Sequence, residues 1–135
     1  MKKRKYFDRT SFVYDEMSWG PLFNKQDGKT VKNTDNNSSI YIKDSLKIMK
    51  IPLKKLKGKK VFDIGTGRQS RFFAKQGAEV THLDIGPQAV RELTLWAKKN
   101  KKKVTSIHGD IEKTNIGHNK FDIIFLSGIY QHIEK

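Results

Sequence analysis

The fold of this chain is decided by residues 61–67, which read VFDIGTG. The first four residues are mostly apolar, as in a short buried strand, and two glycines then follow two positions apart. Glycine permits a tight turn and lets a ligand approach bare main chain closely. We therefore expect a strand over 59–64, a glycine-containing turn over 65–70 and a helix over 71–76.

The rest of the chain continues this alternation of strands and helices. Residues 79–84 (EVTHLD) and 103–108 predict two more strands, and the apolar run 121–126 (FDIIFL) predicts a fourth. Pro87 is suited to the first turn of a helix between the second and third strands. The pattern is typical of an α/β fold, a Rossmann-like parallel sheet with helices on both faces.

Three acidic residues stand at the predicted carboxyl ends of successive strands. Asp63 lies inside the end of the first strand, where it can orient the turn or reach a ligand's ammonium group. Asp84 closes the second strand about 20 residues later, where an acid can accept hydrogen bonds from ribose hydroxyls. Asp110 follows the third strand, where it can meet an adenine amino group. Open α/β sheets bind ligands at this edge, so we expect a nucleotide-like ligand there.

Four segments in this order resemble the motifs of class I S-adenosylmethionine-dependent methyltransferases. Asp-Ile-Gly-Thr-Gly (63–67) resembles the family's first motif, and Leu83-Asp84 resembles its acidic end of the second strand. Gly109-Asp110-Ile111 is similar to its adenine-contacting turn. Residues 121–124 with Ser127, Gly128 and His132 resemble its fourth strand and the turn that follows. The resemblance covers about residues 59–135.

The resemblance implies a methyltransferase that uses S-adenosyl-L-methionine and transfers a methyl group to an unidentified acceptor, with a small molecule favoured. No catalytic residue is assigned, although His132 and Tyr130 stand near the expected methyl position. A helix-capping or packing role explains His132 equally well. The residues implied to bind the cofactor are Asp63, Gly65, Thr66, Gly67, Asp84, Ile85, Asp110, Ile111 and Ser127.

The chain departs from the family pattern in two places. Ser70 stands where a third glycine is common, and only the first four of the usual seven strands are present. The alternatives are a truncated domain that binds cofactor or RNA without turnover and, ranked lower, an NAD-binding Rossmann domain. The second of these prefers Gly or Ala at position 70. We also expect the apolar fourth strand to form an open sheet edge that permits self-association.

Residues 1–38 form an N-terminal extension ahead of the predicted cofactor-binding domain, 39–135. Its first half is rich in aromatic residues, and these could form a lid over the cofactor or pack on the sheet as an extra helix. Its second half is polar and reads as a loop.

The composition excludes several classes of protein. The 135 residues contain no cysteine, no metal-ligand spacing and no apolar run near the roughly 18 residues of a membrane span, so we expect a cytoplasmic protein without metal or membrane. The net charge of +14 leaves two interpretations open. Lysine clusters at 54–60 and 98–103 could attract RNA, other nucleic acid or an anionic membrane surface, or they could be solvated surface, which the scarcity of arginine favours.

Overall fold

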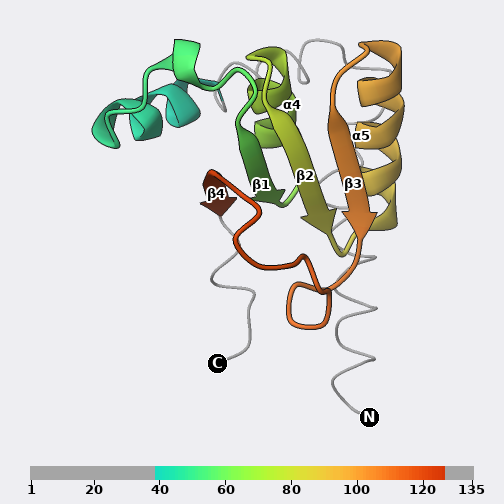
Figure 1. Cartoon of the computed structure of the whole chain (residues 1–135). Helices are drawn as coiled ribbons and strands as arrows, with labels where there is room; N and C mark the ends of the chain where they lie inside the picture. Colours follow the sequence, from blue (N-terminus) through green and yellow to red (C-terminus); the bar gives the residue numbers. More distant parts are fainter. Residues whose placement is uncertain (1–38, 127–135) are drawn as a thin grey trace.

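The computed structural model describes residues 39–126, and these form one α/β unit (Figure 1). All four strands are parallel, and their order across the sheet is β3-β2-β1-β4. The predicted fold class is therefore confirmed. The strands are β1 (Lys60–Ile64), β2 (Glu79–Asp84), β3 (Val104–His108) and β4 (Ile123–Leu126).

The helices are residues 39–48, the short 3-10 helix η2 (Leu53–Lys55), α4 (Arg68–Lys75) and α5 (Pro87–Lys99). Helix α4 begins at Arg68, three residues earlier than the sequence predicts. Gly67 has φ of 81°, and this left-handed conformation completes the turn within three residues of the strand. Pro87 occupies the first turn of α5, as predicted.

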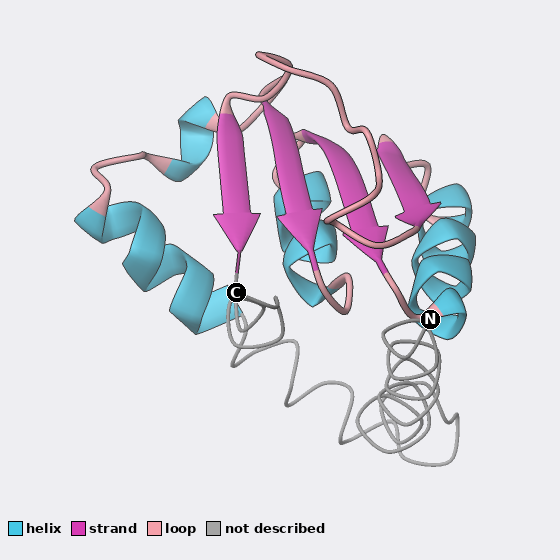
Figure 2. Cartoon of the chain, turned by 90° about the horizontal axis from the view of Figure 1, so that it is seen from below, coloured by secondary structure: helices cyan, strands magenta, loops and turns pink. Residues whose placement is uncertain are grey.

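The two long connecting helices lie on the same face of the sheet (Figures 1 and 2). The core on that face joins Phe72 and Phe73 of α4 to Val61 and Val80 of the strands, and Trp96 of α5 packs against it. Right-handed crossovers that move the chain in one direction, from β1 to β2 to β3, place their helices on one side. The sequence predicts helices on both faces of the sheet, whereas α4 and α5 both lie on one face (Figures 1 and 2).

The connection from β3 back to β4 crosses the opposite face. Ile107, Ile111, Ile116 and Phe121 pack there against a second core of Phe62, Ile64 and Leu83. Phe121 is therefore not part of the fourth strand, which begins at Ile123. Its ring instead stacks on Phe62, with ring centroids 5.1 Å apart.

Strand β4 pairs with β1 along one side, and no strand among residues 39–126 pairs with its other side. Ile124 is 61% exposed and Leu126 is 54% exposed, whereas Phe125 is buried beside Phe73. This is the open apolar edge that the sequence predicts, within the part of the chain that the structure describes.

The aromatic extension 1–38 lies outside the described residues, so its interpretation as a lid stays a prediction. None of the helices between residues 39 and 126 has the length and apolar character that a membrane crossing requires.

We expect the 135-residue chain to self-associate as its concentration rises, because unpaired N–H and C=O groups and exposed apolar side chains on β4 can pair with a second copy. Sedimentation velocity across a concentration series measures this. Ile124→Lys should shift the distribution toward monomer. The matched variant Leu95→Lys, on an equally exposed residue of α5, should not. A wild-type chain that stays monomeric throughout would contradict the prediction.

Candidate functional site

The carboxyl ends of three strands meet at one edge of the sheet. The Gly65 N–H donates to the Leu83 carbonyl at 3.2 Å, and the Gly109 N–H donates to the Asp84 carbonyl at 3.0 Å. These bonds continue the strand ladders by one residue and bring the glycine turn, Asp84 and the turn at Asp110 side by side. The structure thus gathers the three motifs that the sequence places at the sheet edge.

The glycine turn depends on backbone conformations that other residues rarely adopt. Gly65 has φ of 132° and Gly67 has φ of 81°. A Cβ added to Gly67 would also lie 3.1 Å from Leu93 Cδ2 of α5. The turn therefore requires glycine at position 67 both for its conformation and for the close approach of α5.

Asp63 ties the end of β1 to the start of α4. It is fully buried, and its Oδ2 accepts a 2.6 Å hydrogen bond from Ser70 Oγ in the first turn of the helix. Burial raises the pKa of Asp63 to about 6, and the Ser70 hydroxyl and backbone N–H oppose that rise. Gly67 has no side chain to cap the helix, so the carboxylate of Asp63 supplies the negative group that a helix N-terminus favours. This geometry supports the turn-orienting role expected for Asp63.

His82 holds the other side of the turn. Its fully buried ring contacts the Gly65 carbonyl through Nε2 and Ser106 Oγ through Nδ1, the latter at 2.7 Å. A carbonyl can only accept, so Nε2 carries the proton and Nδ1 accepts from the serine hydroxyl. Desolvation lowers the pKa of His82 to about 4, against the opposing effect of the Gly65 bond, so the ring is neutral at physiological pH.

Asp84 and Asp110 each stabilise the turn that follows them. Asp84 Oδ1 accepts a 2.6 Å bond from the Gly86 N–H, and Asp110 Oδ1 accepts a 2.9 Å bond from the Glu112 N–H. Asp110 Oδ2 forms an ion pair with Lys113 Nζ at 3.3 Å, but this contact does not have the geometry of a hydrogen bond. Both acids therefore serve as turn acids as well as standing where a ligand is expected.

The neighbouring candidate residues are also found at this edge. Thr66 Oγ1 accepts a 3.3 Å bond from Arg68 Nε, and the Ile85 carbonyl accepts a 2.9 Å bond from His108 Nε2. Ile111 packs on the second core. Ser127, Tyr130 and His132 lie outside the described residues, so their expected roles stay predictions.

Residues 39–126 contain no group of three or more His, Asp or Glu side chains that could hold a metal ion.

The sequence did not predict Ser70 as the hydrogen-bond partner of Asp63. It also did not predict any role for His82 or Ser106 in supporting the site. One sequence signal could have indicated His82: it is a polar residue at a position where the alternating pattern of strand 79–84 predicts a buried side chain. Asp63, His82 and Ser106 are register partners across β1, β2 and β3 and share one face. That alignment depends on strand pairing, which periodicity does not supply.

The sequence matches the model of a methyltransferase domain over residues 62–135, more than half of the chain. Among solved structures, protein PH0226 from Pyrococcus horikoshii OT3 is 26% identical with a TM-score of 0.58, and the match covers 81% of this chain and 49% of that one. A protein from Methanococcus maripaludis assigned as an S-adenosyl-L-methionine-dependent methyltransferase is 19% identical with a TM-score of 0.56, and the match covers 97% and 52%. The chain thus spans about half the length of these structures. No curated protein matches the sequence.

Asp63 and His82, the two fully buried titratable groups within residues 39–126, should give opposite dependences of stability on pH. The pKa of His82 is about 4 in the folded protein against an ordinary value of 6.5, so its contribution to the free energy of unfolding is lost as pH falls from 6.5 to 4. Asp63 has a folded pKa of about 6 against 3.8, so its contribution grows as pH falls through the same range. Each shift corresponds to about 3 kcal/mol, so the two largely cancel in the wild type.

Urea unfolding of Asp63→Asn and His82→Gln between pH 7 and 4 separates the two effects. The stability of Asp63→Asn relative to wild type should fall by about 3 kcal/mol as pH drops, and that of His82→Gln should rise by about as much. Differences that stay flat with pH for both variants would show that neither group titrates as described.

Proposed function

Because the chain belongs to the methyltransferase-domain family, we propose that its carboxyl-edge site binds S-adenosylmethionine and that the protein transfers the cofactor's methyl group to an acceptor. The observation that carries this proposal is the meeting of the glycine turn with Asp84 and Asp110 at one sheet edge, through the Gly65 and Gly109 backbone bonds. Open parallel sheets bind nucleotide-like ligands at this edge.

The residues at this edge fit the hydrogen-bonding groups of the cofactor. Its ribose hydroxyls and adenine amino group are donors, and the site offers carboxylate acceptors at Asp84 and Asp110. Gly65 and Gly67, whose positive φ values favour glycine, present main chain without a Cβ just after the end of β1. We propose that Asp84 holds the ribose, that Asp110 meets the adenine and that the glycine turn lies against the methionine part. Thr66, Ile85, Ile111 and Ser127 would complete the contacts.

The cofactor, when bound, supplies an already activated methyl group on its sulfonium. The work left to the protein is alignment and exclusion of water. Asp63 and His82 help to align the cofactor by positioning the turn: Asp63 binds the start of α4, and His82 binds the Gly65 carbonyl. Both side chains are fully buried, so water cannot readily compete for the hydrogen bonds that support the turn.

An NAD-binding domain shares the first strand, the turn and the acid after the second strand. It prefers Gly or Ala at the third position of the fingerprint, where this chain has Ser70. Ser70 is fully buried and bonded to Asp63, so its hydroxyl has a structural purpose here. Together with the family match, this supports the methyltransferase function over the dinucleotide one.

We expect isothermal titration calorimetry to detect binding of S-adenosylmethionine or its demethylated product to the 135-residue chain. Asp84→Asn should weaken that binding by about 1–3 kcal/mol, roughly fivefold to 150-fold, because the ribose hydroxyls lose a charged acceptor. Asparagine keeps an oxygen that can accept from the Gly86 N–H, so the turn should survive.

Asp44→Asn, the same replacement on the exposed face of helix 39–48, is the matched control and should leave binding unchanged. Binding of NAD with no binding of either methyl-transfer compound would contradict the proposed function.

A further inference from the structure

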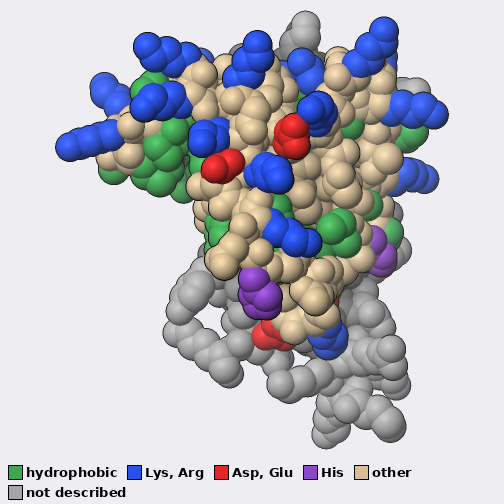
Figure 3. All heavy atoms as spheres, viewed as in Figure 1, with side chains coloured by type: hydrophobic (Ala, Val, Ile, Leu, Met, Phe, Trp, Pro, Cys, Tyr) green, Lys and Arg blue, Asp and Glu red, His purple; other side chains and the backbone are tan. Residues whose placement is uncertain are grey.

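Charge is segregated between the two ends of the sheet. Residues 54–60 contain five lysines and residues 98–103 contain five, with no acid in either segment. Both segments lead into the amino ends of strands, β1 and β3. The acids of the candidate site stand at the carboxyl ends, about 17 Å away along a six-residue strand. Figure 3 shows Lys and Arg gathered along the end where the strands begin.

The fold brings the two lysine segments together on either side of β2. The Glu79 N–H donates to the Lys59 carbonyl at 2.8 Å, and the Val80 N–H donates to the Lys103 carbonyl at 2.9 Å. Segments about 40 residues apart in the sequence therefore flank the first two residues of one strand. We call the surface formed by residues 54–60 and 98–103 the amino-edge surface.

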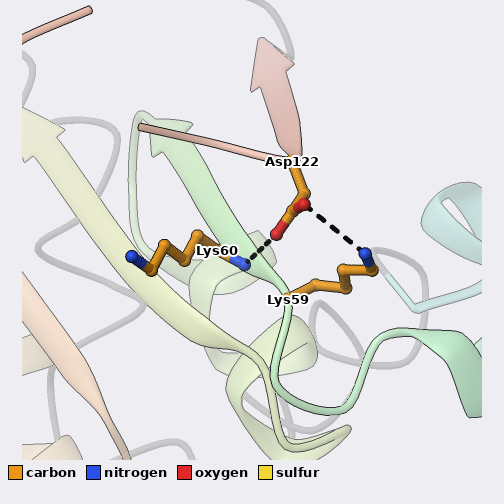
Figure 4. A network of polar contacts seen from close by, with 3 residues as sticks. All are labelled: Lys59, Lys60 and Asp122. Atoms are coloured by element: carbon orange, nitrogen blue, oxygen red, sulfur yellow. Dashed lines mark hydrogen bonds and ion pairs between the residues drawn. The ribbon is translucent and has the colours of Figure 1, made fainter. Parts of the chain in front are cut away.

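The acids that lie at this edge are already matched. Lys103 Nζ lies 2.8 Å from Glu79 Oε1, and the bond and charge of Lys103 lower the pKa of Glu79. Asp122 Oδ2 accepts a 2.8 Å bond from the Lys60 N–H, and its Oδ1 lies 3.4 Å from Lys59 Nζ (Figure 4). These contacts lower the pKa of Asp122, with the Lys60 bond contributing most. Of the ten lysines on the amino-edge surface, only Lys59 and Lys103 form ion pairs within residues 39–126. The positive charge of the surface is therefore largely uncompensated.

The lysine side chains of this surface are suited to binding phosphate groups through charge attraction, without base-specific contacts. Lysine presents a strongly hydrated point charge suited to phosphate, without the planar fork that arginine uses to read bases. An anionic membrane would also attract lysines, but stable membrane attachment adds apolar groups that insert. None of the exposed large apolar residues within residues 39–126 belongs to this surface: Leu95 lies on α5, and the others lie on residues 40–49 and β4.

We propose that the amino-edge surface docks the phosphate backbone of nucleic acid, at the end of the sheet opposite the glycine turn. The sequence alone favours solvated lysines. The convergence of the two segments beside β2 and the pairing of the nearby acids argue for a binding surface. Because the contacts are to phosphates, RNA and DNA single strands of equal length bind alike and without sequence preference. The surface is independent of the proposed methyl transfer.

Fluorescence anisotropy with labelled 20-nucleotide RNA and DNA tests this over a salt series, using the full 135-residue chain. The triple variant Lys54→Gln, Lys55→Gln, Lys99→Gln should weaken binding and make the negative slope of log K against log salt shallower by about 2, since each lost single-strand phosphate contact removes about 0.7. The matched triple Lys43→Gln, Lys47→Gln, Arg91→Gln removes the same charge from other exposed sites and should change the slope little.

Two further measurements complete the test. Acetylation of the wild-type chain with and without RNA, read by mass spectrometry, should show protection at residues 54–60 and 98–103 and none at Lys43 or Lys47. Cosedimentation with phosphatidylcholine–phosphatidylserine vesicles should show weaker binding than RNA at equal salt. Equal losses in the two triples, uniform protection, tighter binding to vesicles, or no binding to either nucleic acid would each overturn the proposal.

Discussion

Hydrogen bonds from two fully buried side chains fix the glycine turn, and the rest of the site depends on that turn. Asp63 and His82 are adjacent across β1 and β2, fully buried, and on the same face of the sheet. Asp63 binds the start of α4, and His82 binds the Gly65 carbonyl. Asp63 Oδ1 already lacks a hydrogen-bond partner, so breaking either bond would leave a further buried polar atom unpaired, at a cost in stability. The two bonds thus hold the turn from both sides. Leu93 of α5 can then approach Gly67 closely.

The parallel sheet also separates two kinds of chemistry. Every strand ends at the same edge, so the turns that follow β1, β2 and β3 gather acids and bare backbone there. Every strand begins at the opposite edge, so the segments that lead into β1 and β3 gather lysines. The proposed cofactor site and the proposed nucleic-acid surface therefore lie at opposite ends of β2, and one can be altered without touching the other.

Local patterns in the sequence predicted some elements at their observed bounds. The second strand, 79–84, was predicted with its observed bounds, and Pro87 marked the start of α5. The start of α4 was placed three residues late, because the left-handed conformation of Gly67 is not evident from its position alone. The fourth strand was drawn too long, because the apolar character of Phe121 serves stacking on Phe62 and not strand pairing.

The sequence by itself determined the α/β class, the family resemblance and the acids at the strand ends, because these depend on short-range periodicity and on motif order. The tertiary structure alone decided which residues meet. Strand register aligned Asp63, His82 and Ser106 in one row, and it placed residues 59 and 103 on either side of β2. Register arises from pairing between segments 20 to 60 residues apart, and no local pattern encodes the partner. The function of His82 was therefore not evident until its strand was paired.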